Sequence, residues 1–570
     1  MLHDFNGKEH LVNGLDYRLK IKENRISVIL SGTEVAKLSV ISAVNRTLAD
    51  GSGEIPDTAG NEPVLVSVKE EKGKVTFCWE HTGTLWDKKE YILCCDPLRF
   101  TYSVSVYGHG AVDSVNYFSG DIQAELCGSY YEFSEGFYPN VSWLGNEPYT
   151  FSAGFPYSRI NLLMVPPMTC YSFSTCGISQ QLAFGLVAEK GHHNFSCFDY
   201  KISKNNFDSG FYFSTDQAGH ELIDGHLVLP QIVVFSAPDT MSAMEQFAEY
   251  YFLSGNAVRK VPRPCPRFWY GPFLCGWIEQ LLYAKQQKVP EFSLSTESFY
   301  RSMLSSLKAH GLHPRALIID DKWQNAYADC KADPEKFPDM RRFTDELHQE
   351  GISTILWFKL WHGEGLPEEI CITNTKYRKE CYDPSHPKVK EHLKKVLRRL
   401  LSSEKGCYNA DGLKLDFAFL FPLGRQVKTA SGNYGLELLY ELMELIYTEA
   451  KKIKPHALIN CSPCHPYFAH LCDQVRLHDY NWAQRCNPEE MKMRSRLFSI
   501  ANPGTLTDTD NAGFTSHRDT MRYLALQPSL GVPDLYNVTG TKEHFAFTED
   551  DWDILSQVWQ EYEAKINGLL

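Results

Sequence analysis

The stretch Asp411-Gly412-Leu413-Lys414-Leu415-Asp416-Phe417-Ala418-Phe419 places two charged side chains inside an apolar run. It begins with a turn-forming Asp-Gly pair and continues like a strand that is buried on both faces. Lys414 and Asp416 are two residues apart, so on a strand they point to the same side and can pair. A buried ion is costly unless it is paired or used. The stretch therefore predicts either a structural ion pair in a core or part of an active site.

Short apolar runs alternate with amphipathic helical patterns on both sides of this stretch. Eight such repeats in about 290 residues predict a (β/α)8 barrel, and 411–419 is its fourth strand. The expected strands are 268–277, 316–321, 354–358, 411–419, 457–460, 474–477, 504–507 and 533–536. The expected helices in this part are 296–310, 341–350, 387–402, 435–453 and 550–566.

The chain before the barrel follows a different pattern. Segments such as 17–22 and 100–107 alternate polar and apolar residues between Gly-, Asn- and Asp-rich turns, which is typical of a β-sandwich. Residues 238–254 have helical spacing, and the proline-rich run 261–266 marks a boundary. We expect an N-terminal β-sandwich at 1–237, a linker helix and proline-rich connection at 238–266, and the barrel at 267–570. No C-terminal β domain is evident.

Composition narrows the classes of partner and compartment. The 570-residue chain is 43% hydrophobic and carries a net charge of −13, which argues against nucleic acid and anionic membranes as partners. The N-terminus has no signal-peptide pattern, and no apolar run approaches the length of a membrane span. The 17 scattered cysteines then indicate reduced thiols and a cytoplasmic protein.

Polar residues follow nearly every apolar run of the predicted barrel. In such barrels the chemistry lies at the C-terminal ends of the strands, so these side chains should meet at one mouth. They are Asp320, Asp321, Lys322 and Trp323 after strand two, Lys359, Trp361 and His362 after strand three, Lys414 and Asp416 on strand four, Asn460, Cys461 and Ser462 after strand five, Arg476, His478 and Asp479 after strand six, and Asp508 and Asp510 after strand seven. Two opposed carboxylates are what glycosidic cleavage needs, and Trp can stack on a sugar ring.

A metal-dependent hydrolase is the rival interpretation. Four histidines lie near the ends of strands three, five and six: His362, His465, His470 and His478. However, the chain has no HExxH motif, and Cys461-Ser462-Pro463-Cys464 is a lone CxxC without a partner pair. We therefore expect neither a metal nor another cofactor.

Several motifs, in this order along the chain, resemble those of glycoside hydrolase family 36, the α-galactosidase family that shares a clan with families 27 and 31. The resemblance covers most of the chain and implies a β-supersandwich followed by a catalytic (β/α)8 barrel. The motifs are LIIDDKWQ (317–324), LKLDFAF (413–419), NCSPC (460–464), DQVRLHDY (473–480) and LTDTDN (506–511). The second is similar to the family's strand-four motif, whose aspartate is the nucleophile.

The resemblance implies roles for individual residues in a retaining mechanism through a glycosyl-enzyme. Asp416 would be the nucleophile and Asp479 the acid/base, with Asp473 as the fallback for the second role. Asp320 and Asp321 would bind sugar hydroxyls, Lys414 would hold a hydroxyl near the nucleophile, and Arg476 would contact the sugar near the acid/base. The complete substrate-binding set that we predict is Asp320, Asp321, Trp323, Trp357, Lys359, Lys414, Cys461 and Arg476.

Two lysines depart from the family pattern. Lys322 stands where the family usually has glycine, and Lys359 stands where many members have an acidic or small residue. A cation at residue 359 would change the preferred sugar or favour an anionic group on it.

Three functions stay open at this point. The first is a retaining exo-hydrolase of terminal α-galactosyl or closely related α-glycosyl residues. The second is a transferase of the raffinose-synthase type, and the third is a non-catalytic sugar-binding relative. The expected partner is an oligosaccharide or glycoside, and a homo-oligomer is compatible with the sequence.

Overall fold

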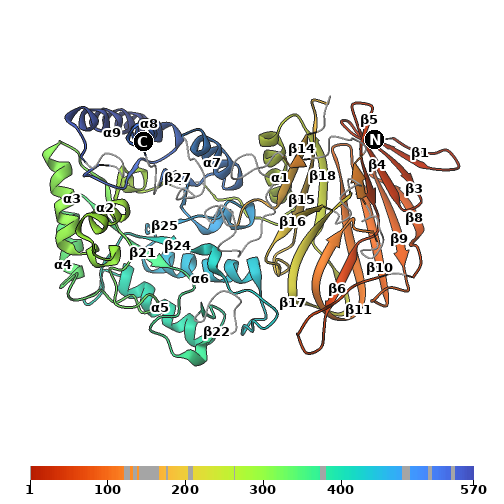
Figure 1. Cartoon of the computed structure of the whole chain (residues 1–570), viewed down its shortest axis with the longest axis horizontal. Helices are drawn as coiled ribbons and strands as arrows, with labels where there is room; N and C mark the ends of the chain where they lie inside the picture. Colours follow the sequence, from red (N-terminus) through yellow and green to blue (C-terminus); the bar gives the residue numbers. More distant parts are fainter. Residues whose placement is uncertain are drawn as a thin grey trace.

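Two bodies lie side by side in the computed structural model of the chain, a (β/α)8 barrel and an antiparallel β domain (Figure 1). The β domain contains the N-terminus, the barrel contains the C-terminus, and helix α1 (Thr240–Leu253) lies where they meet. The structure describes residues 2–58, 60–120, 129–131, 138–139, 166–174, 178–202, 210–261, 264–372, 381–477, 488–510, 516–540 and 546–569.

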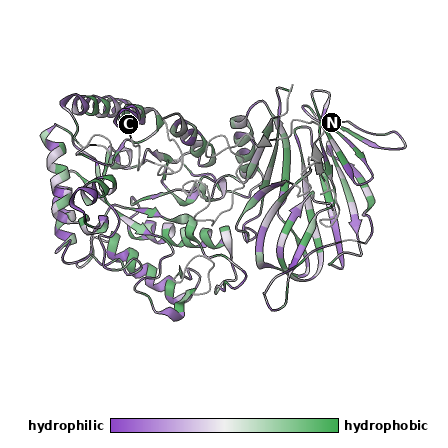
Figure 2. Cartoon of the chain, in the orientation of Figure 1, coloured by the Kyte–Doolittle hydropathy of each residue, from purple (hydrophilic) through white to green (hydrophobic). Residues whose placement is uncertain are grey.

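The N-terminal β domain is built from antiparallel strands whose side chains alternate between core and solvent. β9 and β10 show this period of two in burial. Hydrophilic and hydrophobic residues are interspersed along the strands of this domain (Figure 2). The strands are β1 (Leu2–Phe5), β2 (His10–Asn13), β3 (Arg18–Lys22), β4 (Arg25–Leu30), β5 (Thr33–Ser39), β6 (Ala43–Thr47), β7 (Glu54–Ile55), β8 (Val64–Glu71), β9 (Lys74–His81), β10 (Lys88–Cys95), β11 (Arg99–Tyr117), β12 (Ser129–Tyr131), β13 (Tyr138–Pro139), β14 (Cys170–Ser174), β15 (Gln181–Val187), β16 (Phe198–Ile202), β17 (Gly210–Val228) and β18 (Gln231–Ala237).

The barrel is an eight-stranded parallel sheet that is nearly closed. Its strands in spatial order are β19 (Phe273–Cys275), β20 (Ala316–Ile319), β21 (Ser353–Lys359), β24 (Gly412–Asp416), β25 (Leu458–Cys461), β26 (Gln474–Arg476), β27 (Leu506–Asp508) and β28 (Asp534–Leu535). β28 pairs with β19, and a bridge between Asp508 and Val532 joins β27 to the start of β28. The predicted fold class, a (β/α)8 barrel after an N-terminal β domain, is confirmed. The boundaries that we drew at 237 and 266 stay predictions.

Helices cover the outside of the barrel. They are α2 (Trp277–Gln287), α3 (Glu297–Ala309), α4 (Met340–Gln349), α5 (Pro387–Leu401), α6 (Gly435–Ile453), α7 (Pro488–Ala501), α8 (His517–Leu530) and α9 (Glu549–Leu569), and a short hairpin of β22 (Cys371–Ile372) and β23 (Cys381–Tyr382) follows β21. The expected helices are present, whereas α2, α7 and α8 were not predicted. A proline inside α8, Pro528, interrupts the sequence pattern of that helix.

Two expected strands are shorter in the structure. The stretch 268–277 yields a 3₁₀ turn at Arg267–Tyr270 and only then β19. Pro272, which has no backbone N–H, separates the two. The strand expected to reach residue 419 ends at Asp416, because Phe417 has φ +62°, which no β-strand accommodates. Asp416 therefore stands at the mouth instead of inside the sheet.

The β domain is anchored to the barrel at the start of α6. The backbone N–H groups of Leu436 and Glu437 donate to the carbonyls of Phe195 and His193, at 3.1 and 3.0 Å. The buried His193 ring stacks on Tyr467, with 3.7 Å between ring centroids. Gly435 lies against the same segment, since a Cβ there would come within 2.1 Å of the Phe195 carbonyl oxygen. This contact fixes the β domain against α6, the helix that follows β24.

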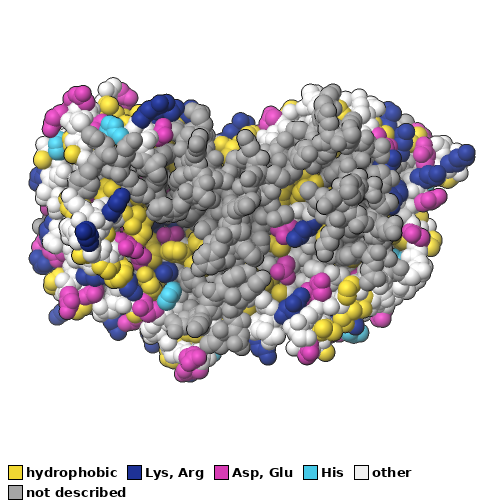
Figure 3. Space-filling view, in the orientation of Figure 1, with side chains coloured by type: hydrophobic (Ala, Val, Ile, Leu, Met, Phe, Trp, Pro, Cys, Tyr) yellow, Lys and Arg dark blue, Asp and Glu magenta, His cyan; other side chains and the backbone are white. Residues whose placement is uncertain are grey.

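The described surface mixes charges of both signs. Acidic and basic side chains are interspersed on the face shown in Figure 3. Among the described residues, no helix combines the length and the apolar character that crossing a bilayer requires.

Replacing Gly435 by alanine should destabilise the protein more than the same change at Gly432. Both glycines have positive φ, +57° and +81°, but nothing lies within 4 Å of a Cβ at residue 432. Gly432→Ala should lower the free energy of unfolding by about 1–2 kcal/mol, the cost of the left-handed backbone. Gly435→Ala should cost about 3 kcal/mol or more, because a steric clash is added. Urea denaturation measures both, and equal losses would contradict the close contact with Phe195.

Candidate active site at the C-terminal ends of the barrel strands

A chain of alternating charges crosses the interior of the barrel toward its mouth. Asp416 Oδ1 lies 2.9 Å from Arg476 Nη2, and Arg476 Nη1 lies 2.8 Å from Asp510 Oδ2. The same Asp510 oxygen is 3.9 Å from Lys414 Nζ, which lies 2.8 Å from Asp320 Oδ2. These five residues, which we call the charge chain, come from β24, β26 and the segments directly after β20 and β27. Strands that are distant in sequence thus bring opposite charges together.

The partners of Lys414 and Asp416, the two charged residues inside the stretch 411–419, differ from our expectation. Lys414 and Asp416 share a side of β24, but Lys414 bonds to Asp320, directly after β20, and to the Tyr536 hydroxyl at 3.0 Å, whereas Asp416 bonds to Arg476. Burial opposes the charge on Lys414, yet the Asp320 and Asp510 carboxylates outweigh it and hold its pKa well above the usual value. Lys414 is therefore a permanent cation inside the barrel.

Asp416 is the accessible end of the charge chain. Its side chain is 17% exposed, whereas that of Arg476 is 1% exposed. Besides Arg476, it accepts hydrogen bonds from the Trp357 indole N–H at 3.0 Å and from the Phe417 backbone N–H at 2.8 Å. Three donors stabilise the ionised carboxylate and fix its orientation. The site thus presents a held, ionised carboxylate to whatever binds at the mouth.

Three residues near the C-terminal ends of the barrel strands have strained backbone conformations. Lys322, Trp361 and Phe417 all have positive φ, +68°, +71° and +62°, and follow strands β20, β21 and β24. Such conformations are costly for residues other than glycine and are concentrated at functional sites. The positive φ at Lys322 explains why glycine, which adopts this backbone conformation without strain, suits this position. The Lys322 ammonium is 2.9 Å from Glu364.

Asp321, Lys359 and Tyr327 form a second group beside Asp416. Lys359 is the register partner of Asp416, and its ammonium lies 4.1 Å from the centre of the Tyr327 ring and 4.8 Å from that of Phe417. Burial, and then the neighbouring Asp320, raise the pKa of Asp321 to about 6, although Lys359 acts in the opposite direction. The buried Asp321 Oδ1 has no hydrogen-bond partner among the described residues. This oxygen is a candidate acceptor for a ligand hydroxyl.

Two other residues of the predicted binding set lie behind the mouth. Trp323 is fully buried, and its indole N–H donates to the Trp357 carbonyl at 2.9 Å. Cys461 is also buried, and burial raises the pKa of its thiol to about 12. Both side chains therefore support the site from within the fold.

The two acid/base candidates have different outcomes. Asp479 and its neighbour His478 lie outside the described residues. Asp473 precedes β26, at the end opposite Arg476, and bonds to Lys260 and Lys451 at 3.0 and 2.5 Å. Burial would raise the pKa of Asp473, but these two ammonium groups prevail and lower it. Asp473 is a structural ion-pair residue at the closed end of the barrel, so we do not propose it for catalysis.

Sequence reasoning missed several residues of this interior. Tyr536 and Cys275 contact Lys414, and Asp534 lies buried at the start of β28. The ammonium groups of Lys322 and Lys359 lie over the Tyr327 ring. The alternation of apolar runs located their strands. No local signal marks them as polar contacts, because the contacts are made across the barrel.

Three of the four histidines of the rival metal interpretation are described, and each is hydrogen-bonded to a protein group through one ring nitrogen. His362 Nδ1 accepts from the Glu364 backbone N–H at 3.2 Å. His465 Nε2 lies 3.1 Å from Thr169 Oγ1, and His470 Nε2 lies 3.2 Å from the Tyr440 hydroxyl. His478 lies outside the described residues. In the described part of the chain, no three side chains of His, Cys, Asp or Glu form a group that could hold a metal ion.

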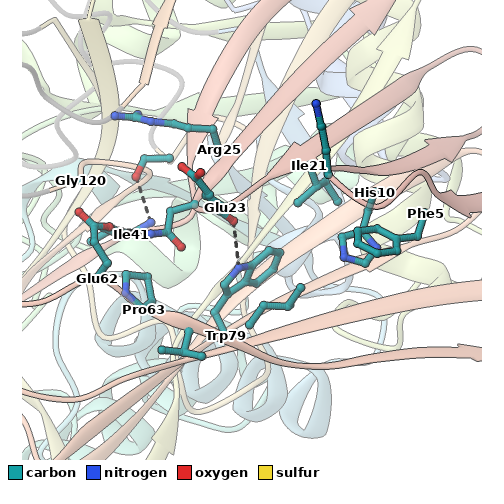
Figure 4. A pocket seen from close by; sticks show the side chains of 15 residues that line it. Phe5, His10, Ile21, Glu23, Arg25, Ile41, Glu62, Pro63, Trp79 and Gly120 are labelled. Atoms are coloured by element: carbon teal, nitrogen blue, oxygen red, sulfur yellow. Dashed lines mark hydrogen bonds between the residues drawn. The ribbon is translucent and has the colours of Figure 1, made fainter.

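A groove of about 720 Å³ lies elsewhere, in the N-terminal β domain (Figure 4). Trp79 is fully buried at this groove, and its indole N–H donates to the Glu23 carbonyl at 3.3 Å. The ring is therefore not a platform on which a sugar could stack. The groove is also separate from the carboxylates of the barrel.

Comparisons with known proteins support the fold. No protein-family model and no curated protein matches the sequence. A GH31 family sulfoquinovosidase from E. rectale aligns over 98% of this chain and 82% of its own, with 12% identity and a TM-score of 0.53. A cycloalternan-forming enzyme from Listeria monocytogenes aligns over 95% and 57%, with 12% identity and a TM-score of 0.51. A GH36 α-galactosidase from Geobacillus stearothermophilus aligns over 99% and 86%, with 11% identity and a TM-score of 0.49. At such identities the similarity shows a shared fold.

Removing the cation at the centre of the charge chain should destabilise the barrel strongly. Lys414→Met leaves Asp320 and Asp510 buried with less positive charge, so we expect a loss of about 3–5 kcal/mol in the free energy of unfolding. Lys322→Met is the matched control, because its ion pair with Glu364 is partly exposed, and it should cost about 1 kcal/mol or less. Denaturation in urea near neutral pH measures both. An unchanged stability of Lys414→Met would refute the role of Lys414.

Proposed function

We propose that the protein is a retaining exo-glycoside hydrolase that removes terminal α-galactosyl, or closely related α-glycosyl, residues from oligosaccharides. The observation that carries the proposal is the Asp416 carboxylate, ion-paired with Arg476 at the accessible end of a buried charge chain. Three hydrogen-bond donors hold this carboxylate at the mouth of a (β/α)8 barrel. Solved structures with a similar fold include a sulfoquinovosidase, and the sequence motifs resemble those of α-galactosidases.

In this proposal Asp416 attacks the anomeric carbon and forms a covalent glycosyl-enzyme. Because Arg476, Trp357 and the Phe417 N–H stabilise its negative charge, the carboxylate is ionised before the substrate arrives. The same donors make it a competent leaving group when water attacks in the second step. A protonated carboxyl must also donate to the leaving oxygen. Asp479 has this role by resemblance, and it remains a prediction.

Asp321 and Lys359 are suited to bind the sugar beside Asp416. The Asp321 Oδ1 atom can accept a hydrogen bond from a hydroxyl, and the Lys359 ammonium can donate one. Trp357 and Phe417 are in edge-to-face contact beside Asp416, with 6.1 Å between ring centroids. The Trp357 ring is buried, whereas Phe417 is partly exposed and can supply apolar surface. An α-glycoside with several hydroxyls satisfies these groups better than an apolar ligand does.

The first test is hydrolysis of a panel of aryl α-glycosides by the native protein and by Asp416→Asn. We expect cleavage of an α-galactoside or a close relative, and a fall in kcat/KM by a factor of about 10⁴ or more in the variant. Asp224→Asn is the matched control, because the Asp224 side chain is 94% exposed on the β domain. Full activity of Asp416→Asn would refute the mechanism, and cleavage of β-glycosides alone would refute the substrate class.

The second test is the stereochemistry of the product. A double displacement gives a first-formed sugar with the anomeric configuration of the substrate. Proton NMR during the first turnovers should therefore show the α-anomer before mutarotation. Initial appearance of the β-anomer would mean that water attacks directly and that Asp416 is not a nucleophile.

A further inference from the structure

Two buried carboxyl groups beside the charge chain have no cation of their own. Asp508 ends β27 and Asp534 begins β28, and both side chains are fully buried. They are neighbours, because Asp508 bridges to Val532 and Asp534 follows two residues later on the same side of that strand. The charge chain already assigns Lys414 and Arg476 to Asp320, Asp510 and Asp416. If both extra carboxyls were ionised, five carboxylates would face only two cations, which is prohibitively costly.

The hydrogen-bond donors distinguish the two carboxyls. Asp508 accepts from the Asn460 side-chain amide at 2.7 Å and from the Asp510 backbone N–H at 3.0 Å, one donor on each oxygen. Neither carboxyl oxygen of Asp534 accepts a hydrogen bond from an N–H or O–H group of the described residues, although both of these oxygens are buried. The carboxyl of Asp508 lies beside Asp534, across the bridge that joins β27 to Val532. Donors on Asp508 favour its ionised form, and a carboxyl without donors must be neutral.

We propose that Asp534 is a protonated carboxylic acid that donates its proton to an ionised Asp508, and that this bond makes Asp534 a positioning residue for Asp416. The path is short. Asp508 accepts from the backbone N–H of Asp510, and Asp510 binds the Arg476 guanidinium that holds Asp416. The catalytic part of this inference rests on the proposed function, whereas the protonation state does not.

The groups that face the pair favour a retained proton. Burial, followed by mutual repulsion between Asp508, Asp510 and Asp534, raises the pKa of Asp534 well above its ordinary value, and burial likewise raises the pKa of Asp508. Lys414 acts in the opposite direction on both, but Asp320 already binds it. The charged or titratable groups around the pair are Asp320 from β20, Cys275 from β19, Lys414 from β24, Arg476 from β26, Asp510 after β27 and Tyr536 after β28.

Infrared difference spectroscopy at pH 8 tests the proton directly in the full-length protein. Free aspartate is ionised at this pH, so a carboxylic-acid C=O band reports a group with a strongly raised pKa. We expect this band in the native protein, its loss in Asp534→Asn, and its retention in Asp508→Asn. Absence of the band from the native protein, or its loss in Asp508→Asn alone, would overturn the assignment. This measurement does not depend on whether the protein cleaves glycosides.

Two variants of Asp534 test the positioning role in the assay that establishes activity. The amide of an asparagine side chain would keep a donor toward Asp508, so Asp534→Asn should retain kcat within about fivefold and keep the pH profile of kcat/KM. Asp534→Leu removes the donor at similar volume, and kcat should fall about ten- to hundredfold. The acidic limb of the pH profile of kcat/KM should also move to higher pH in Asp534→Leu. In this variant Arg476 positions Asp416 less well, so the Asp416 carboxylate binds a proton more readily. Equal loss in both variants, or an unmoved limb in Asp534→Leu, would refute the positioning role.

Discussion

Charge inside a barrel must be paired, and the site of this protein is built on that constraint. Lys414 and Arg476 are almost fully buried, at 2% and 1% exposure, and each lies between two carboxylates. Desolvation of so many ions is tolerable only because cation and anion alternate along the charge chain. The order Asp320, Lys414, Asp510, Arg476, Asp416 ends at the one member that is partly exposed. A network in which each cation lies between two carboxylates thus places a single oriented carboxylate at the mouth.

The fold supplies the geometry that this network requires. Three of the strands that supply the charge chain, β20, β24 and β26, are not neighbours in the sheet, so the distances between their side chains depend on closure of the barrel by β28 and by the Asp508–Val532 bridge. The β domain supports the barrel through a contact away from the charge chain. Its segment around His193 and Phe195 anchors the start of α6, the helix that follows β24 in the chain. The positive φ at Phe417 then ends β24 at Asp416, which places the carboxylate at the mouth and the Phe417 N–H against it.

The sequence predicted the architecture better than it predicted the contacts. Apolar runs at regular intervals located all eight barrel strands, because parallel strands buried on both faces have an apolar pattern. The partner of Lys414 could not be derived in this way, since it depends on which strand lies opposite β24 across the barrel. Asp534 escaped notice because it begins its strand, whereas we searched the strand ends for polar residues. Trp323 was assigned to sugar binding from its place after Asp320 and Asp321, but only tertiary packing shows that its ring faces the interior.

The central claim is that Asp416 forms a covalent bond with the sugar. Incubation with an activated 5-fluoro-α-glycosyl fluoride, which slows the second step more than the first, followed by proteolysis and mass spectrometry, tests this claim most directly. The account predicts one added glycosyl group per chain, on the peptide that contains Asp416. Attachment to a peptide from any other strand, or rapid turnover and inhibition without any covalent adduct, would contradict it.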